Sequence, residues 1–150
     1  MLQRIQTVYL LLASICMVVS LLTNLAIFSF DGEIVRFEAM GFYMNQEIIF
    51  STWGLFVIGN ISAILSVVIV FLYSKRMLQI RLAGMNIFII LGYYALIGFY
   101  IYNRNPEFNS VFENIGVGIV MPFVAIVLTY LAIRKIGADE ALIRSLNRIR

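Results

Sequence analysis

The stretch Trp53–Tyr73, WGLFVIGNISAILSVVIVFLY, contains no charged side chain. At 1.5 Å per residue, a helix of this length spans about 30 Å, which is the thickness of the hydrocarbon core of a bilayer. Three further stretches share this character: Thr7–Phe28, Leu82–Tyr102 and Ile115–Ile133. The sequence therefore predicts an all-α membrane protein, a bundle of four transmembrane helices in a single domain over residues 1–150.

Charged residues are distributed unequally between the two sides of these spans. The side with both chain ends carries two acids, Asp139 and Glu140, and nine bases: Arg4, Lys75, Arg76, Arg81, Arg134, Lys135, Arg144, Arg148 and Arg150. The other side carries two bases against six acids: Arg36 and Arg104, then Asp31, Glu33, Glu38, Glu47, Glu107 and Glu113. Because basic residues accumulate in cytoplasmic loops, we expect both termini in the cytoplasm, and we expect residues 29–52 and 103–114 outside. This distribution explains the pI of about 9.2 without nucleic acid.

The outer link over residues 29–52 has strand-like character. Asp31 and Gly32 form a turn signal, and the following residues are rich in β-branched and aromatic types. Val35, Phe37 and Ala39 alternate with Ile34, Arg36 and Glu38. We expect a short β-like outer loop with two strands, packed on the outer ends of the helices or on a partner. The second outer link contains Asn105 and Pro106, which indicate a turn.

The carboxyl end has the pattern of an amphipathic helix on the cytoplasmic side. Gly137 is expected to end the fourth span, and Asp139 is expected to cap a separate tail helix over residues 139–150. Apolar and basic positions of this tail lie on different faces, and the amino end lies on the same side of the membrane. The predicted partner-docking residues are Gln3, Arg4, Gln6, Leu142, Arg144, Leu146, Arg148 and Ile149.

Polar residues within the spans are few. Asn60, Ser62, Ser66 and Asn86 are the main candidates for polar packing between helices, and Asn60 lies nearest the middle of its span. An alternative is that Asn60, Asn86 and the tyrosines of the third span line a polar path.

Several chemistries lack the residues that they require. The chain has no histidine and one cysteine, Cys16, so the usual haem, zinc and copper sites are not expected. The four spans contain no Asp or Glu, the usual proton-coupling groups of small exporters, and Glu113 is the nearest acid. No nucleophile elbow or phosphate-binding loop is present. We therefore expect no catalytic residues, no cofactor and no metal.

Two cytoplasmic segments carry a resemblance to a known family. The opening Met1–Ala13, MLQRIQTVYLLLA, and the closing Asp139–Ser145, DEALIRS, followed by Arg148–Arg150, resemble small bacterial membrane proteins of Bacteroidota. That family is known as a domain of unknown function. The resemblance extends from end to end and implies a four-helix protein of the inner membrane. It implies no activity and no site residues.

These observations favour a non-enzymatic accessory or scaffolding subunit of a larger complex in the bacterial inner (cytoplasmic) membrane. Its expected partners are membrane lipids and other integral membrane proteins, and no nucleic acid. The first alternative is a small oligomeric transporter or channel-like protein. The second is a lipid-modifying membrane enzyme that uses Glu113 or the outer-loop acids.

Overall fold

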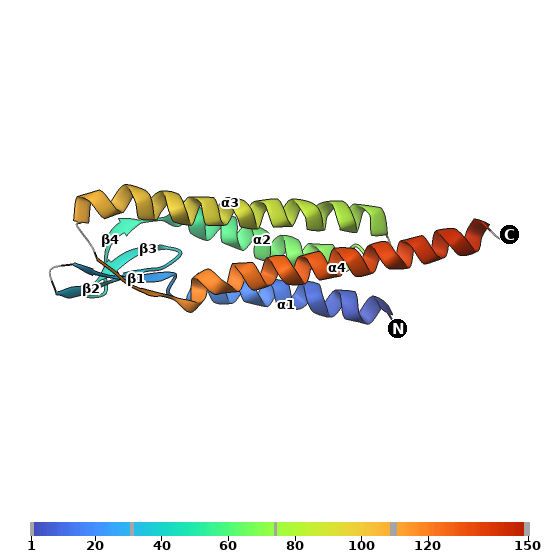
Figure 1. Cartoon of the computed structure of the whole chain (residues 1–150), viewed down its shortest axis with the longest axis horizontal. Helices are drawn as coiled ribbons and strands as arrows, with labels where there is room; N and C mark the ends of the chain where they lie inside the picture. The colour runs from blue at the N-terminus through green and yellow to red at the C-terminus, as the bar shows by residue number, and fades with distance from the viewer. Residues whose placement is uncertain (1, 31, 74, 109–110, 149–150) are drawn as a thin grey trace.

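The computed structural model describes residues 2–30, 32–73, 75–108 and 111–148, without the side chains of residues 2–4, 104–108, 144 and 146–148. Four helices carry a five-stranded antiparallel sheet at one end (Figure 1). The helices are α1 (Leu2–Leu22), α2 (Trp53–Phe71), α3 (Arg76–Phe108) and α4 (Val117–Arg148). The strands are β1 (Ala26–Phe30), β2 (Glu33–Phe37), β3 (Gly41–Met44), β4 (Glu47–Ser51) and β5 (Val111–Ile115).

The prediction of an all-α bundle is therefore wrong, because the protein has an α+β fold. The outer segment forms four strands where two were expected, and β5 adds a fifth by pairing with β1. The predicted first span was also too long, since α1 ends at Leu22 and Ile27 and Phe28 belong to β1. Hydropathy alone does not separate a buried strand from the end of an apolar helix.

Two tight hairpins set the register of the sheet. Gly32 has a φ of +85° between β1 and β2, a conformation that glycine adopts without steric cost. Between β3 and β4, Asn45 and Gln46 have φ values of 49° and 71°. Positive φ at both central residues is the requirement of a type I′ hairpin, whose twist matches that of the paired strands. The strand order is β4-β3-β2-β1-β5.

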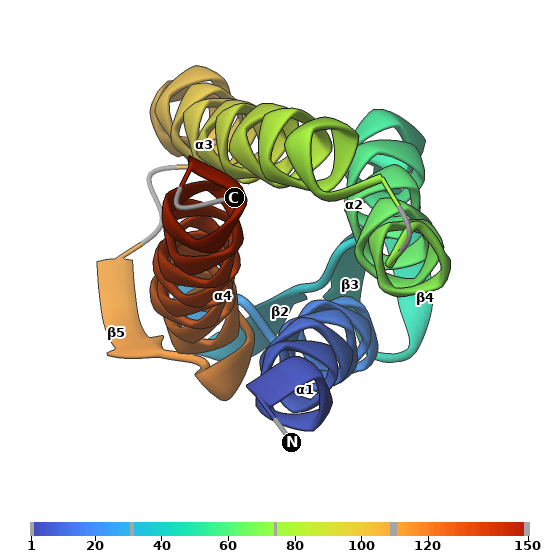
Figure 2. The same ribbon diagram turned by 90° about the vertical axis from the view of Figure 1, so that its right-hand side faces the viewer.

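The helices pack in a closed ring in which α1 contacts α2 and α4, and α3 contacts the same two neighbours (Figure 2). All four are long and apolar enough to cross a membrane. α1 begins and α4 ends at the same end of the bundle, opposite the sheet (Figure 1). Two helices are longer than their predicted spans: α3 continues through Pro106, where a turn was expected, and α4 continues to Arg148.

The predicted separate tail helix is also absent, because α4 is continuous from Val117 to Arg148. Gly137 and Asp139 lie inside this helix, where a break and a cap were expected. The tail is thus a rigid extension of the fourth helix, and it projects beyond the other helices in Figure 1. Asp139 does not cap a helix, and its carboxylate accepts a hydrogen bond from α1.

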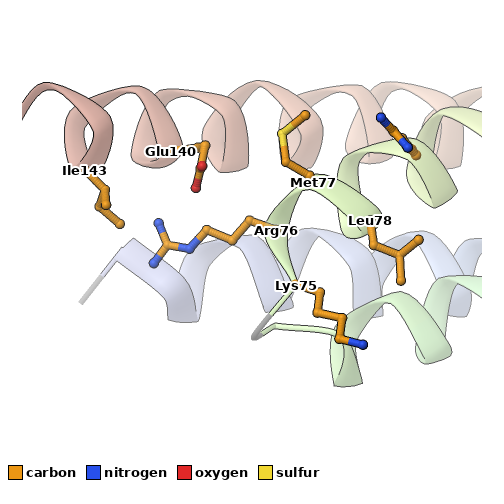
Figure 3. A pocket seen from close by; sticks show the side chains of 7 residues that line it. Lys75, Arg76, Met77, Leu78, Glu140 and Ile143 are labelled. Atoms are coloured by element: carbon orange, nitrogen blue, oxygen red, sulfur yellow. The ribbon is translucent and has the colours of Figure 1, made fainter. Parts of the chain in front are cut away.

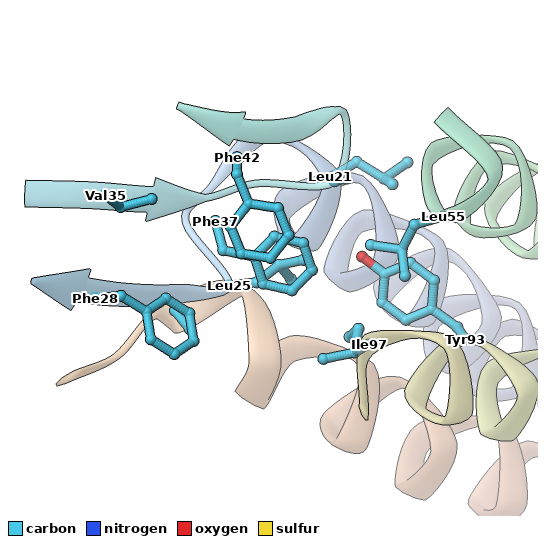
Figure 4. Packing of buried hydrophobic residues seen from close by; sticks show 11 residues of the cluster. Leu21, Leu25, Phe28, Val35, Phe37, Phe42, Leu55, Tyr93 and Ile97 are labelled. Atoms are coloured by element: carbon cyan, nitrogen blue, oxygen red, sulfur yellow. The ribbon is translucent and has the colours of Figure 1, made fainter. Parts of the chain in front are cut away.

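The largest core cluster joins the sheet to the adjoining ends of the helices (Figure 4). The rings of Phe37 and Phe42 stack with centroids 4.3 Å apart, on the face of the sheet that covers the bundle. Val35, Phe37 and Ala39 are buried, whereas Ile34 and Arg36 are exposed, so the predicted alternation is confirmed. Two smaller clusters continue the core along the helices.

The junction between helices and sheet is fixed by close backbone contacts. The N–H of Gly116 donates to the carbonyl of Leu25 at 2.9 Å, and the N–H of Gly118 donates to Asn24 at 3.0 Å. A Cβ at Gly116 would overlap the carbonyl of Asn24. Glycine at this position therefore lets the start of α4 lie directly against the end of α1 and holds the sheet in place.

Candidate functional site

Ser62, Ser66 and Asn86 form a buried polar group between α2 and α3. The Oγ of Ser62 donates to Oδ1 of Asn86 at 2.8 Å, and Nδ2 of Asn86 donates to Oγ of Ser66 at 2.8 Å. All three side chains have no exposed area. Each of these polar atoms bonds to a side chain of the other helix. Hydrogen bonds of this kind hold helices together within a bilayer.

Asn60 lies apart from this group. Its Nδ2 donates to the carbonyl of Phe56, one turn earlier in the same helix, at 2.9 Å. Its side chain is half-buried. The amide nearest the middle of the span therefore bonds to its own helix, and Asn86 is the one that joins two helices.

Two tyrosines of α3, Tyr93 and Tyr94, are also engaged in packing, whereas Tyr102 is exposed. The hydroxyl of Tyr93 lies 3.2 Å from that of Ser20, which itself donates to the carbonyl of Gly118 at 2.6 Å. The Tyr94 hydroxyl donates to the carbonyl of Ile119. Such contacts between spans favour a structural role for these groups, because their polar atoms are already bonded within the protein.

The predicted docking residues of the two ends have different surroundings. Gln6 is buried and donates from Nε2 to Oδ2 of Asp139 at 2.6 Å, whereas Leu142 is exposed. The side chains of Gln3, Arg4, Arg144, Leu146 and Arg148, and all of Ile149, lie outside the described part of the chain. The hydrogen bond from Gln6 to Asp139 joins α1 to α4.

The acids that the enzyme alternative requires are dispersed. Glu113 is exposed on β5, where the sequence suggested the outer start of the fourth helix. Within the described residues, no three His, Cys, Asp or Glu side chains are grouped so that they could hold a metal ion.

A groove lies on the face of the sheet turned away from the core, and we name it the outer-face groove. Its volume is about 740 Å³, and its walls include Ile27, Ile34 and Arg36 with the turn residues Gly32, Asn45 and Gln46. Ile27 pairs with Arg36 across β1 and β2, so the two side chains share this face. The groove thus lies by the tips of both hairpins.

The surface around the outer-face groove mixes apolar, aromatic and charged groups, and the acid Glu33 also lines the groove. Arg36 pairs with Tyr43, and Tyr43 pairs with Ile48, which extends the same row across β3 and β4. Ile34 is 58% exposed and Ile48 is 55% exposed. The alternation of Ile34 and Arg36 was visible in the sequence, but the turn at Asn45 and Gln46 was not, so the groove was not predicted.

The fold and this surface define a helical membrane-type bundle that presents a β-sheet at one end. The chain belongs to the family described as Domain of unknown function (DUF4293), whose model matches residues 2–149. Membership of a domain-of-unknown-function family, which the segments near the two chain ends indicated, is thereby confirmed. No curated protein and no solved structure matches the chain.

Proposed function

We propose that this protein is a non-enzymatic accessory subunit of a membrane complex, and that it holds a partner protein through the outer-face groove. The observation that carries the proposal is the exposure of Ile34 and Ile48 on the face of the sheet that covers no helix. Arg36 and Tyr43 lie between them in the same surface. Arginine and aromatic residues beside apolar groups are enriched in the centres of protein interfaces.

The apolar residues on the helices need no such partner. Ile64, Phe88 and Phe123 are exposed along helices that are apolar enough to cross a membrane, and lipid would cover them. The hairpin tips that border the outer-face groove extend away from the bundle, where lipid is not expected (Figure 1). Exposed Ile34 in the groove and exposed Ile48 on the same face of the sheet favour a protein contact.

The face of the sheet suits a partner better than either of its edges does. The pairing of β1 with β5 shifts at Ile27 and Phe28, and the pairing of β3 with β4 shifts at Phe42 and Tyr43. Both edge strands also contain a glutamate, Glu113 in β5 and Glu47 in β4. Irregular register and charged side chains are common devices that protect an edge from pairing with another strand.

The charge of the sheet indicates the chemistry of the partner. Residues 26–51 contain four acids and one base, Arg36. A partner with basic side chains around an apolar centre would complement this surface, because complementary potentials steer encounter and fix orientation. We therefore propose the extracytoplasmic part of a second membrane protein with such a basic surface.

The proposed setting is the cytoplasmic membrane of a bacterium of the Bacteroidota, with both termini in the cytoplasm and the sheet outside. The excess of basic residues at the end where α1 begins and α4 ends supports this orientation. The resemblance of Met1–Ala13 and Asp139–Ser145 to membrane proteins of Bacteroidota supports a bacterium of this group as the source.

Site-specific photo-cross-linking in intact cells tests the proposal. A photo-reactive amino acid at Ile34 is expected to give one discrete protein adduct. The added substitution Glu33→Lys, at an exposed residue that lines the groove, is expected to reduce this adduct strongly, because a new positive charge repels a basic partner surface. The matched control is Ile64, which is 61% exposed on α2 against 58% for Ile34. At Ile64 we expect lipid adducts alone. Equal adducts at the two positions, or an adduct at Ile34 that Glu33→Lys leaves unchanged, would reject the outer-face groove as the docking site.

A further inference from the structure

A second hollow lies at the opposite end of the protein, between the start of α3 and the last turns of α4, and we name it the basic pocket (Figure 3). Its volume is about 660 Å³. Three of its lining residues are cations, Lys75, Arg76 and Arg81, and one is an acid, Glu140. Arg76 extends from α3 toward the part of α4 that carries Glu140 and Ile143 (Figure 3). The pocket therefore has an excess of positive charge.

The wall of the basic pocket is held by hydrogen bonds of the segment that joins α2 to α3. The N–H of Lys75 donates to the carbonyl of Leu72 at 3.0 Å, and the N–H of Gln79 donates to Lys75 at 3.0 Å. Nε2 of Gln79, which is buried, donates to the carbonyl of Ile69 at the end of α2 at 3.1 Å. These bonds fix the first turn of α3 against α2, so the backbone that carries Lys75 and Arg76 is held in place.

One nitrogen atom in this pocket lacks a hydrogen-bond partner. Nη1 of Arg76 is buried and donates to no acceptor among the described residues. Buried polar atoms are almost always paired, and a buried guanidinium nitrogen without an acceptor is costly. A bound anion would supply the missing acceptor. Arg76 is also the first residue of α3, where the helix dipole favours negative charge.

Apolar side chains beside the cations favour a lipid over a free anion as the ligand of this pocket. Met77, Leu78 and Ile143 also line the basic pocket, and each is substantially exposed. They lie beside helices that are apolar enough to cross a membrane. A hollow with cations and an apolar border at the end of a membrane span fits a phospholipid, whose phosphate meets the cations while its chains follow the apolar border.

We propose that the basic pocket binds the phosphate group of an anionic phospholipid. This lipid belongs to the leaflet on the side of the membrane where both chain ends lie. Lys75, Arg76 and Arg81 bind the headgroup, and Nη1 of Arg76 donates to a phosphate oxygen. Met77, Leu78 and Ile143 contact the upper part of the acyl chains. This site is separate from the outer-face groove, which lies at the other end of the molecule.

Native mass spectrometry of the full chain in mild detergent tests this assignment with three probes: phosphatidylglycerol, phosphatidylcholine and inorganic phosphate. We expect phosphatidylglycerol to bind at least about tenfold more tightly than phosphatidylcholine, and millimolar inorganic phosphate not to displace it. The double variant Arg76→Gln/Arg81→Gln is expected to weaken phosphatidylglycerol binding by about tenfold or more. Arg76→Lys keeps the charge but loses the planar guanidinium, so we expect an intermediate loss.

The matched control is Arg134→Gln/Lys135→Gln, which removes the same charge from exposed residues of α4 that do not line the pocket. We expect this control to retain binding. An equal loss in both double variants would assign the effect to diffuse surface charge and overturn the proposal. Displacement by inorganic phosphate would overturn it in favour of a free anion. If Arg76→Gln/Arg81→Gln fails to fold, Lys75→Gln, at an exposed residue, replaces it in the same comparison.

Discussion

Nε2 of Gln6 donates a 2.6 Å hydrogen bond to Oδ2 of Asp139, which joins the start of α1 to the last turns of α4 across 133 residues of sequence. Gln6 is buried, so loss of its acceptor would leave an amide without a partner. This bond fixes the end of the bundle that is farthest from the sheet. It also explains why a residue with the chemistry of a helix cap lies inside a helix.

The substitution Asp139→Leu is therefore expected to destabilise the bundle by about 1–3 kcal/mol, because it removes the acceptor and leaves Gln6 unpaired. Asp139→Asn keeps an acceptor oxygen at the same place and should cost less. Unfolding by a denaturing detergent, followed by circular dichroism in mixed micelles, gives both values. A stability of Asp139→Leu equal to that of the parent chain would show that this hydrogen bond contributes nothing.

Two asparagines of the spans should respond differently to replacement by leucine. Asn86→Leu leaves the hydroxyls of Ser62 and Ser66 without their partner on the other helix, and we expect a loss of about 1–2 kcal/mol. Asn60→Leu removes a bond within one helix and should change stability by less than about 0.6 kcal/mol. The same unfolding assay compares the two variants. A larger loss at Asn60 than at Asn86 would contradict this assignment of roles.

The helices were predictable because a bilayer requires long apolar segments. The local composition of the sequence is enough to identify such segments. The sheet was only partly predictable. The alternation of Ile34 and Arg36 with Val35 and Phe37 gave the two faces of β2, since a half-buried strand has a period of two. The pairing of β1 with β5 joins residues that are more than eighty positions apart, and no local pattern reports such a contact.

The candidate sites also depend on contacts between residues that are distant in the sequence. The sequence placed Lys75, Arg76 and Arg81 at one end of the bundle, but only the packing of α3 against α4 brings them beside Glu140. Likewise, Asn60 and Asn86 are chemically identical, and the position of a residue along a span does not say which neighbour it faces. Asp139 lies inside a continuous helix and accepts a hydrogen bond from Gln6, although its residue type indicated a cap.

Two glycines should differ sharply when each is changed to alanine. At Gly116 a Cβ would overlap the backbone of Asn24, so Gly116→Ala must separate α1 from α4 and should cost about 1–3 kcal/mol. At Gly92 nothing lies within 4 Å of the added atom, and Gly92→Ala should leave stability unchanged or raise it by up to about 1 kcal/mol. Detergent unfolding measures both. Similar losses at the two positions would mean that the close approach at Gly116 does not limit packing.

The orientation in the membrane is open to a direct test by cysteine labelling. Cys16 is first replaced by alanine, which leaves a chain without thiols, and single cysteines are then placed at Glu47 and at Lys75. Both positions are exposed and lie at opposite ends of the molecule, on β4 and before α3. Because basic residues are retained in the cytoplasm, an impermeant maleimide should label Glu47→Cys and not Lys75→Cys in spheroplasts.

Permeabilised spheroplasts supply the control, because there the reagent should label both cysteines and so show that each thiol is reactive. Labelling of Lys75→Cys alone before permeabilisation would invert the orientation and place the outer-face groove in the cytoplasm. Such an outcome would also move the proposed lipid site to the outer leaflet, although its cations and its apolar border would be the same. The two proposals are thus separable: photo-cross-linking locates the partner, and lipid binding to the purified chain does not depend on orientation.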